Sequence, residues 1–389
     1  MSRALALALA LALALALLLA AGCARDVELI GGDGGAPACE GLGPPLALPG
    51  HSECAGALAA RTLRYALCAC RSLRTEALST ESFDSTGLTG SDRLSAAVGS
   101  NGELDLRGQC TLGGALHSRN SPRISDLHPR TSTTESLRWD GDLSADDLSV
   151  GGDAFVAGNL AGQVRISGAL HVPATAIVAA TVTAASVLRE PVLVDPPCAC
   201  AAAEALDISA LTVAAAAQND NASIDLDPGA LVGDEEREHL DLPCGTYYVS
   251  AVDTREDFTL RIHGRTRLAV GGDLVAKGNF EVMLDPGAEL DLLVGGTVVA
   301  LGGKELGARA APARVRLWIG GSGTVTLDPG TKLAASVVAP RARLSAGQLE
   351  LAGSLLAREI QTDQLNVRYD RAVLAAGVPC GVPASPAVR

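Results

Sequence analysis

A short glycine motif recurs in the C-terminal half of the chain at a nearly constant interval. Val-Gly-Gly begins at Val270 and Val294, and Ile-Gly-Gly begins at Ile319, so the starts lie 24 and 25 residues apart. This interval is typical of one coil of a β-solenoid, whereas a propeller blade needs about 40 residues or more. Glycine suits the corners of such coils, because it accepts positive φ and lets stacked backbones approach closely.

Short runs of alternating apolar and polar residues, such as GELDLRG and GQVRISG, surround these motifs from about residue 96 onward. Period two indicates strands with one buried face. We therefore predict a mainly β fold, a β-solenoid resembling a parallel β-helix, with a short N-terminal helical, cysteine-containing region and one alanine-rich helix. A β-sandwich is the alternative, because it also joins many short strands by frequent turns.

The tetrapeptide Leu-Asp-Pro-Gly occurs three times and raises the question of a repeated acidic site. Asp-Pro-Gly is also the chemistry of a type II turn, in which Asp caps the backbone, Pro presets φ and Gly accepts positive φ. In the second copy, alternation places Phe280, Val282 and Leu284 inside and the aspartate outside. We interpret these residues as structural turns: Asp227, Pro228, Gly229, Asp285, Pro286, Gly287, Asp328, Pro329 and Gly330.

The first 22 residues form a targeting segment, with a charged start at Arg3 and an apolar run before Gly22-Cys23. The sequence Leu18-Leu19-Ala20-Ala21-Gly22-Cys23 resembles the bacterial lipoprotein signal. The resemblance implies cleavage before Cys23 and lipid attachment to Cys23. An uncleaved membrane helix and an ordinary secretory signal are the alternatives. The lipoprotein interpretation predicts an exported protein anchored to the cell envelope, at the outer membrane or cell surface.

An exported chain meets an oxidising compartment, where disulfides form. Apart from Cys23 there are nine cysteines, so at least one thiol is left without an intrachain partner. The two Cys-Ala-Cys sequences lack the second pair or histidine that a zinc site needs, and we predict neither metal nor cofactor. The candidates for disulfides are Cys39, Cys54, Cys68, Cys70, Cys110, Cys198, Cys200, Cys244 and Cys380.

Composition changes along the chain suggest its division into segments. Apolar residues recur every three to four positions within residues 54–75, which predicts a helix there. A second helix is predicted in the alanine-rich stretch after Cys198. The expected segments are a signal (1–22), a Gly/Pro-rich tether (23–50), a helical cysteine-containing region (51–95), a first β-repeat block (96–190), a cysteine-containing, alanine-rich helical connector (191–245), a C-terminal β-solenoid domain (246–376) and a tail (377–389).

Charge and motifs restrict the possible activities. A net charge of -13 and an aromatic content of 3% disfavour binding to nucleic acid. No nucleophile elbow, phosphate loop or HExxH motif is present. Some parallel β-helices cleave polysaccharides with clustered carboxylates, and five residues here resemble fragments of the polygalacturonase motifs. They are Asp146, Asp147, Asp220, Arg261 and His263. We predict no catalytic residue and keep a polysaccharide-degrading enzyme as an alternative.

The C-terminal third resembles a β-repeat domain of unknown function from surface lipoproteins of myxobacteria and from some proteins associated with type IV pili. The resemblance rests on VGGDLVAKGN, LDPGAELDLLVGG, PARVRLWIGG, SVVAPRARL, LAGSLLA and NVRYD. Family members end in His-Tyr-Asp, whereas this chain has Arg368-Tyr369-Asp370. The domain is also similar in style to the bactofilins, which are polymerising β-solenoids. The resemblance implies scaffold or surface roles without naming a ligand.

Together these observations predict a lipid-anchored structural or adhesive scaffold of the bacterial cell envelope. The expected partners are the membrane, through the N-terminal lipid, and a surface protein or matrix polysaccharide. A self-polymerising scaffold like the bactofilins is the other alternative to the enzyme.

Overall fold

The computed structural model describes residues 61–87, 96–119, 130–201, 206–233 and 238–375. Every strand pairing in these residues is parallel. A β-sandwich is built from antiparallel sheets, so that alternative is wrong and the β-solenoid prediction is confirmed. The signal (1–22), the tether (23–50) and the tail (377–389) lie outside the described residues.

The C-terminal block shows the repeating unit most clearly. One coil consists of β17, β18 and β19, and each of its strands pairs with the corresponding strand of the next coil, β20, β21 and β22. We call these three stacks side 1, side 2 and side 3. The block contains β14 (His239–Leu242), β15 (Gly245–Val249), β16 (Val252–Thr254), β17 (Phe258–Ile262), β18 (Arg265–Val270), β19 (Leu274–Ala276), β20 (Phe280–Leu284), β21 (Glu289–Val294), β22 (Val298–Ala300), β23 (Glu305–Gly307), β24 (Val315–Ile319), β25 (Thr324–Leu327), β26 (Thr331–Ala334), β27 (Ser336–Ala352) and β28 (Leu355–Asp370), with the 3-10 turns η2 (Pro312–Arg314) and η3 (Arg371–Ala375).

The core is a narrow stack of aliphatic side chains with few aromatic rings. Phe280 and Val282 are buried on side 1, and Leu290, Leu292 and Val294 are buried on side 2, as their alternation predicts. Stacking brings like residues together, for example Leu268 on Leu292. Such burial contributes about 25 cal/mol per Å² of apolar surface removed from water, so the coils are held together mainly by this column.

The N-terminal block uses the same coil plan with shorter strands. Asp153 and the glycines before it form a corner here too, although this VGGD leads from side 1 to side 2 rather than from side 2 to side 3. The block contains β1 (Leu67–Phe83), β2 (Val98–Ser100), β3 (Glu103–Leu106), β4 (Gln109–Leu112), β5 (Leu116–Ser118), β6 (Arg130–Thr133), β7 (Leu137–Trp139), β8 (Leu143–Val150), β9 (Ala154–Val156), β10 (Leu160–Ile166), β11 (Ala169–Val172), β12 (Val182–Thr183) and β13 (Ser186–Arg189).

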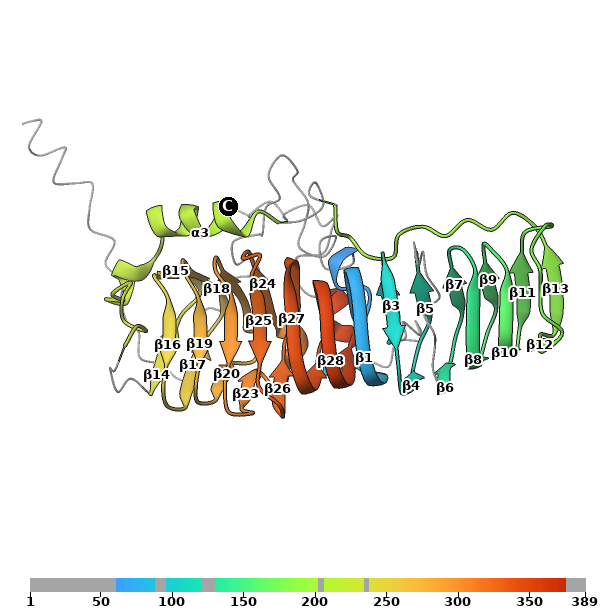
Figure 1. The fold of residues 1–389 in the computed structure, drawn as a ribbon. Helices are drawn as coiled ribbons and strands as arrows, with labels where there is room; N and C mark the ends of the chain where they lie inside the picture. Colours follow the sequence, from blue (N-terminus) through green and yellow to red (C-terminus); the bar gives the residue numbers. More distant parts are fainter. Residues whose placement is uncertain (1–60, 88–95, 120–129, 202–205, 234–237, 376–389) are drawn as a thin grey trace, which may run out of the picture. The chain divides into compact units, whose positions relative to one another are not determined.

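The two blocks stack as one solenoid, in an order that differs from the order of the sequence. β28, the last strand, pairs with β1, the first strand, from Leu355↔Leu67 to Asp370↔Phe83. On its other edge β1 pairs with β2, β3 and β4. The solenoid therefore starts at β14, passes through β28 into β1, and ends at β13. Figure 1 shows β1 beside β28, between the two blocks.

The predicted helix over residues 54–75 is wrong from Leu67 onward, because β1 occupies Leu67–Phe83. The strand bends at coil corners, where the alternation of buried and exposed residues changes phase. Leu73 and Leu78 therefore lie five residues apart although both are buried. Two further inward positions are polar, Thr75 and Thr80. The apolar residues of this strand therefore do not recur at every second position, and their spacing resembles that of a helix.

Residues 190–238, which we call the return segment, lead the chain from the last coil back to the first (Figure 1). The predicted alanine-rich helix is present in it as α3 (Ile208–Ala217), followed by η1 (Asn221–Ser223). Asp207 caps α3 by accepting a hydrogen bond from the Ala210 amide at 3.0 Å. The C-terminal block begins at β14, seven residues before the predicted boundary at residue 246.

α3 covers outward-facing residues of side 2, where it contacts β15, β18 and β21. Ala269 and Leu293 point outward from the coils yet are fully buried. Thr212 of α3 lies against the corner at Gly295, and Ile208 lies against the corner at Gly320. Apolar residues on the outer surface of side 2 are therefore explained by the helix that covers them.

The Val-Gly-Gly corners need glycine for close approach and not for positive φ. A Cβ at Gly321 would overlap the carbonyl oxygen of Gly296 in the coil below, while φ lies outside the left-handed region. At Gly323, two residues later, the nearest atom to a Cβ would be 3.9 Å away.

Gly321→Ala is expected to lower the free energy of unfolding by about 1–3 kcal/mol, because two stacked backbones must separate. Gly323→Ala, the matched control, is expected to change it by less than about 0.5 kcal/mol. Denaturant unfolding monitored by circular dichroism measures both. Equal effects of the two substitutions would contradict the close-approach explanation.

Candidate functional site

Two of the three Leu-Asp-Pro-Gly copies form corners of the C-terminal block, one after β20 on side 1 and one after β25 on side 3. Gly287 and Gly330 have φ of 83° and 84°. The carbonyl of Asp285 accepts a hydrogen bond from Ala288, and that of Asp328 accepts one from Thr331, which closes each four-residue turn. The Asp328 carboxylate also accepts a hydrogen bond from the Gly302 amide at 2.7 Å, so it joins neighbouring coils.

The copy at Asp227 is built differently and lies in the return segment. Its carboxylate accepts a hydrogen bond from the Gly229 amide at 2.6 Å, and the φ of Gly229 is not in the left-handed region. The turn continues through Ala230 and Val232, whose amides bond to the carbonyls of Asp227 and Gly229. This tighter path buries Leu231, so tertiary packing overrides the type II preference of the tripeptide here.

The shared VGGD and GN sequences have a common role at other corners. Asp153 accepts a hydrogen bond from the Ala169 amide, and Asp273 accepts one from the Thr297 amide, both at 2.8 Å. Asn159 and Asn279 each accept one from the next coil, from Ile177 and Glu305. The repeated acidic and amide side chains therefore satisfy backbone donors that a coil corner leaves open.

The residues that resemble polygalacturonase fragments do not converge. Asp147 pairs with Arg165 at 2.7 Å on the N-terminal block. Asp220 accepts a hydrogen bond from the Thr246 amide at 2.7 Å at the first coil. β8, which carries Asp146 and Asp147, lies nine strand-to-strand steps from β17, which carries Arg261. At ~4.8 Å per step these groups are about 40 Å apart.

His263 lies between two carboxylates on the outer surface of side 1. Its Nδ1 is 2.9 Å from Oδ2 of Asp285, and its Nε2 is 3.1 Å from Oδ1 of Asp241. The hydrogen bond to Asp285 is the main reason that the pKa of His263 is raised; burial opposes the shift and Asp241 adds to it. The arrangement favours a charged imidazolium that joins stacked corners.

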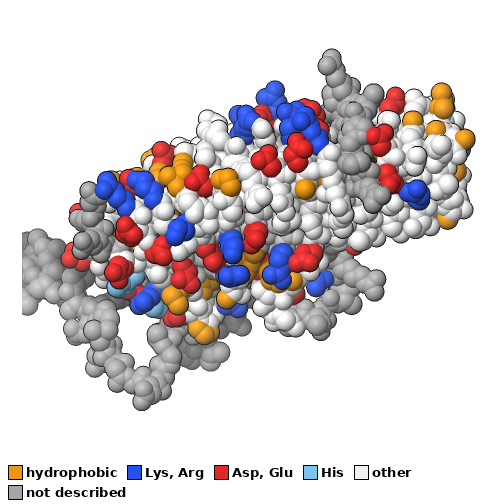
Figure 2. Space-filling view, turned by 60° about the horizontal axis from the view of Figure 1, so that its bottom comes forward, with side chains coloured by type: hydrophobic (Ala, Val, Ile, Leu, Met, Phe, Trp, Pro, Cys, Tyr) orange, Lys and Arg blue, Asp and Glu red, His pale blue; other side chains and the backbone are white. Residues whose placement is uncertain are grey.

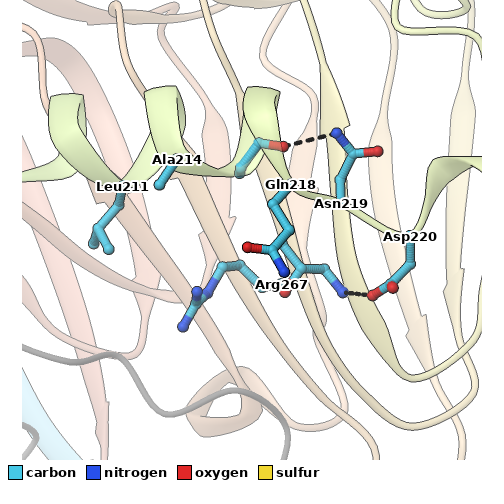
Figure 3. Close-up of a pocket in the computed structure, with 8 residues that line it drawn as sticks. Leu211, Ala214, Gln218, Asn219, Asp220 and Arg267 are labelled. Atoms are coloured by element: carbon cyan, nitrogen blue, oxygen red, sulfur yellow. Dashed lines mark hydrogen bonds between the residues drawn. The ribbon is translucent and has the colours of Figure 1, made fainter.

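A cavity of about 290 Å³ lies beneath the C-terminal part of α3 (Figure 3). Figure 3 shows Arg267 extending from the sheet beneath the helix toward Leu211, with Asn219 and Asp220 at the end of the helix. Burial lowers the pKa of Arg267, against the charge of Asp291. The lining residues are Leu211, Ala214, Ala215, Gln218, Asn219, Asp220, Thr246 and Arg267. This set offers several groups that can form hydrogen bonds with a polar molecule.

A buried cluster of charged residues lies beside this cavity and was not predicted from the sequence. Arg316 donates hydrogen bonds to Asp291 at 2.7 Å and to Glu289 at 2.8 Å, and Trp318 donates one to Asp291 at 3.0 Å. Burial alone would raise the pKa of Asp291, but the charge of Arg316 and these hydrogen bonds hold it below its usual value. The 24–25-residue interval could have revealed the cluster, because Arg267, Asp291 and Arg316 share one position in successive coils.

The two Cys-Ala-Cys sequences bond to each other. Cys68 is joined to Cys198 and Cys70 to Cys200, each across 130 residues of chain. They attach the return segment to β1. Cys244 is also disulfide-bonded, and among the described cysteines Cys110 is free and buried, with a pKa raised by burial to about 11. Cys23, Cys39, Cys54 and Cys380 lie outside the described residues.

In the part of the chain that the structure describes, no group of three or more His, Cys, Asp or Glu residues could hold a metal ion. None of the described helices is long and apolar enough to span a membrane. No family model matches the chain, and no curated protein or solved structure matches it either.

The histidine cluster predicts a pH dependence. Because the folded pKa of His263 is raised, its contribution to stability is fully present below the ordinary value of about 6.5 and is lost as pH rises through the folded pKa. The stability difference between wild type and His263→Gln should therefore be larger at low pH than at high pH. NMR titration of the ring should give a midpoint that falls more in Asp285→Asn than in Asp241→Asn. A midpoint unaffected by Asp285→Asn would contradict this.

The paired disulfides predict a strongly non-additive effect. Either bond alone closes the 130-residue loop, so the second bond then restricts the unfolded chain very little. Loss of the loop closure should cost about 2–5 kcal/mol. Cys70→Ser alone should therefore have a small effect on the free energy of unfolding, and Cys68→Ser/Cys70→Ser a large one. If Cys70→Ser already produced most of the loss, this explanation would be wrong.

Proposed function

We propose that this chain is a lipid-anchored, exported bacterial protein that serves as a structural or adhesive scaffold of the cell envelope. The observation that best supports the proposal is the pair of disulfides that attaches the return segment to β1. Disulfides of this kind persist in an oxidising compartment outside the cytoplasm. Because these disulfides link the return segment to the coils, the outer surface of the solenoid keeps a fixed geometry.

The use of polar side chains supports the same function. The Asp and Asn residues of the repeated motifs accept hydrogen bonds from the backbone of neighbouring coils. Acidic and basic side chains are interspersed on the face shown in Figure 2, and several pair across coils, such as Lys277 with Asp253 at 2.8 Å. These groups stabilise the surface that would be presented to a surface protein or matrix polysaccharide.

Lipid attachment and partner binding can be tested in the same cells. Wild type should incorporate labelled fatty acid and fractionate with the envelope, whereas Cys23→Ala should do neither. Cross-linking on intact cells should trap the same envelope component reproducibly with wild type. Cys110→Ala, which leaves Cys23 in place, controls for the loss of a thiol.

Two results would overturn the proposal. One is Cys23→Ala that is processed and retained at the envelope like wild type. The other is polysaccharide cleavage by the purified chain that Asp220→Asn abolishes.

A further inference from the structure

The last coil of the solenoid leaves its core open. Val178, Val182 and Val187 are the inward residues of its three sides, and they stack on the fully buried Leu160, Val164 and Leu170. No described residue stacks beyond them. Val187 is 48% exposed although it continues the column of the core. An apolar core position with this exposure indicates a surface that another molecule covers.

The backbone of this coil is open as well. β13 pairs with β11 and β12 pairs with β10, and within the described residues neither strand has a neighbour on its other edge. Such an edge presents free amides and carbonyls to another strand. Proteins usually protect an edge of this kind with charges or proline, whereas β13 presents Ser186, Val187 and Leu188 before its single charge at Arg189.

The first coil, at the opposite end, is covered by its own chain on two of its three sides. Asn221 bonds to the amide of Tyr248 at 2.9 Å and to its carbonyl at 2.7 Å. The carbonyl of Leu231 accepts a hydrogen bond from Asp253, and the side chains of Leu226 and Leu231 are buried. The return segment thus caps the β15 and β16 sides of this end, whereas β14, in the part of the chain that the structure describes, pairs only with β17. No corresponding cap is found among the described residues at β13.

The surface of the last coil carries little charge. Residues 173–188 contain no charged residue, in a chain with a net charge of -13. In Figure 2 apolar side chains and few charges are visible at the end that carries β11 to β13 in Figure 1. An uncharged surface cannot select a partner by charge, but it allows two acidic copies to meet without repulsion at the contact.

We propose that the last coil binds the last coil of a second copy of this chain, end to end, in a closed two-fold dimer. Turning one copy over makes its β13 antiparallel to the β13 of the other, so both open edges gain hydrogen bonds. A register with Val187 opposite its own copy keeps both valines in a continuous core. This contact uses the open end of both copies, and the return segment covers two of the three sides at the other end, so assembly stops at two chains instead of extending into a filament.

The chain's own C-terminal tail is a poorer occupant of this edge. It contains Pro379, Pro383 and Pro386, and proline cannot donate to a strand ladder. An identical open coil supplies both the missing donors and the missing apolar core. The inference does not depend on the proposed function, because it concerns assembly alone.

The test is the mass of the full chain, solubilised in mild detergent and measured by light scattering over a range of concentrations. Wild type should have the mass of two chains, and raising the salt concentration should not dissociate it. Val187→Lys should weaken the dimer by about 100-fold or more, because it places a charge in an apolar contact. Val187 is already 48% exposed in the single chain, so its substitution is expected to leave the fold of the monomer intact.

Val213→Lys is the matched control, since Val213 is 68% exposed but lies on α3, and it should leave the dimer unchanged. Circular dichroism should show the same β content in all variants. A monomeric wild type would overturn the proposal, including a monomer in which hydrogen exchange at β13 is protected by the chain's own residues. So would a larger assembly, or a dimer that Val187→Lys does not weaken.

Discussion

The pairing of β28 with β1 is the contact on which the rest of the structure depends. It joins strands from opposite ends of the described chain into one parallel ladder, which runs over all three straight parts of β1 with one register shift between Ala69 and Ser72. Thr362 and Thr75 share a buried hydrogen bond across it, and the hydroxyl of Tyr369 reaches the Leu63 carbonyl at 2.8 Å. Without it each block would expose a further open edge and an unfinished apolar column.

The same contact explains why the return segment exists. Once β1 lies in the middle of the stack, the chain reaches the outer end at β13 and must travel back along the solenoid to begin again at β14. That path lies over side 2, which is where outward positions such as Ala269 and Leu293 are apolar. Surface residues of the coils and the sequence of the connector are therefore parts of one arrangement.

The glycine interval and the alternation of apolar residues were sufficient to predict the coils, because both are local consequences of stacking. Phe280 and Val282 could be placed in the core for this reason. β1 could not be recognised, since Thr75 and Thr80 occupy inward positions and the corners shift the phase. The pairing of β1 with β28 and the disulfide partners of Cys68 and Cys70 depend on contacts across more than a hundred residues, about which a local pattern carries no information.

Among the candidate acidic sites, too, some could be assigned from local sequence and others depend on distant contacts. Asp285 and Asp328 could be assigned to corners from their neighbours Pro and Gly, but Asp227 could not, because the burial of Leu231 decides its turn. The ion pair between Arg316 and Asp291 could have been found from the repeat interval, which places the two residues at one position of successive coils. Function was least predictable, since the repeated residues describe how coils are joined and not what touches them.

The position of β1 beside β28 also has a mechanical consequence. Both ends of the described chain emerge at one junction in the middle of the solenoid, while the coils on either side form loops that leave this junction and return to it. A load applied between residues 61 and 375 is therefore borne by the β1–β28 ladder, and the coils at both ends remain unstressed. The strength of that single junction, rather than the length of the solenoid, sets how much tension the chain withstands.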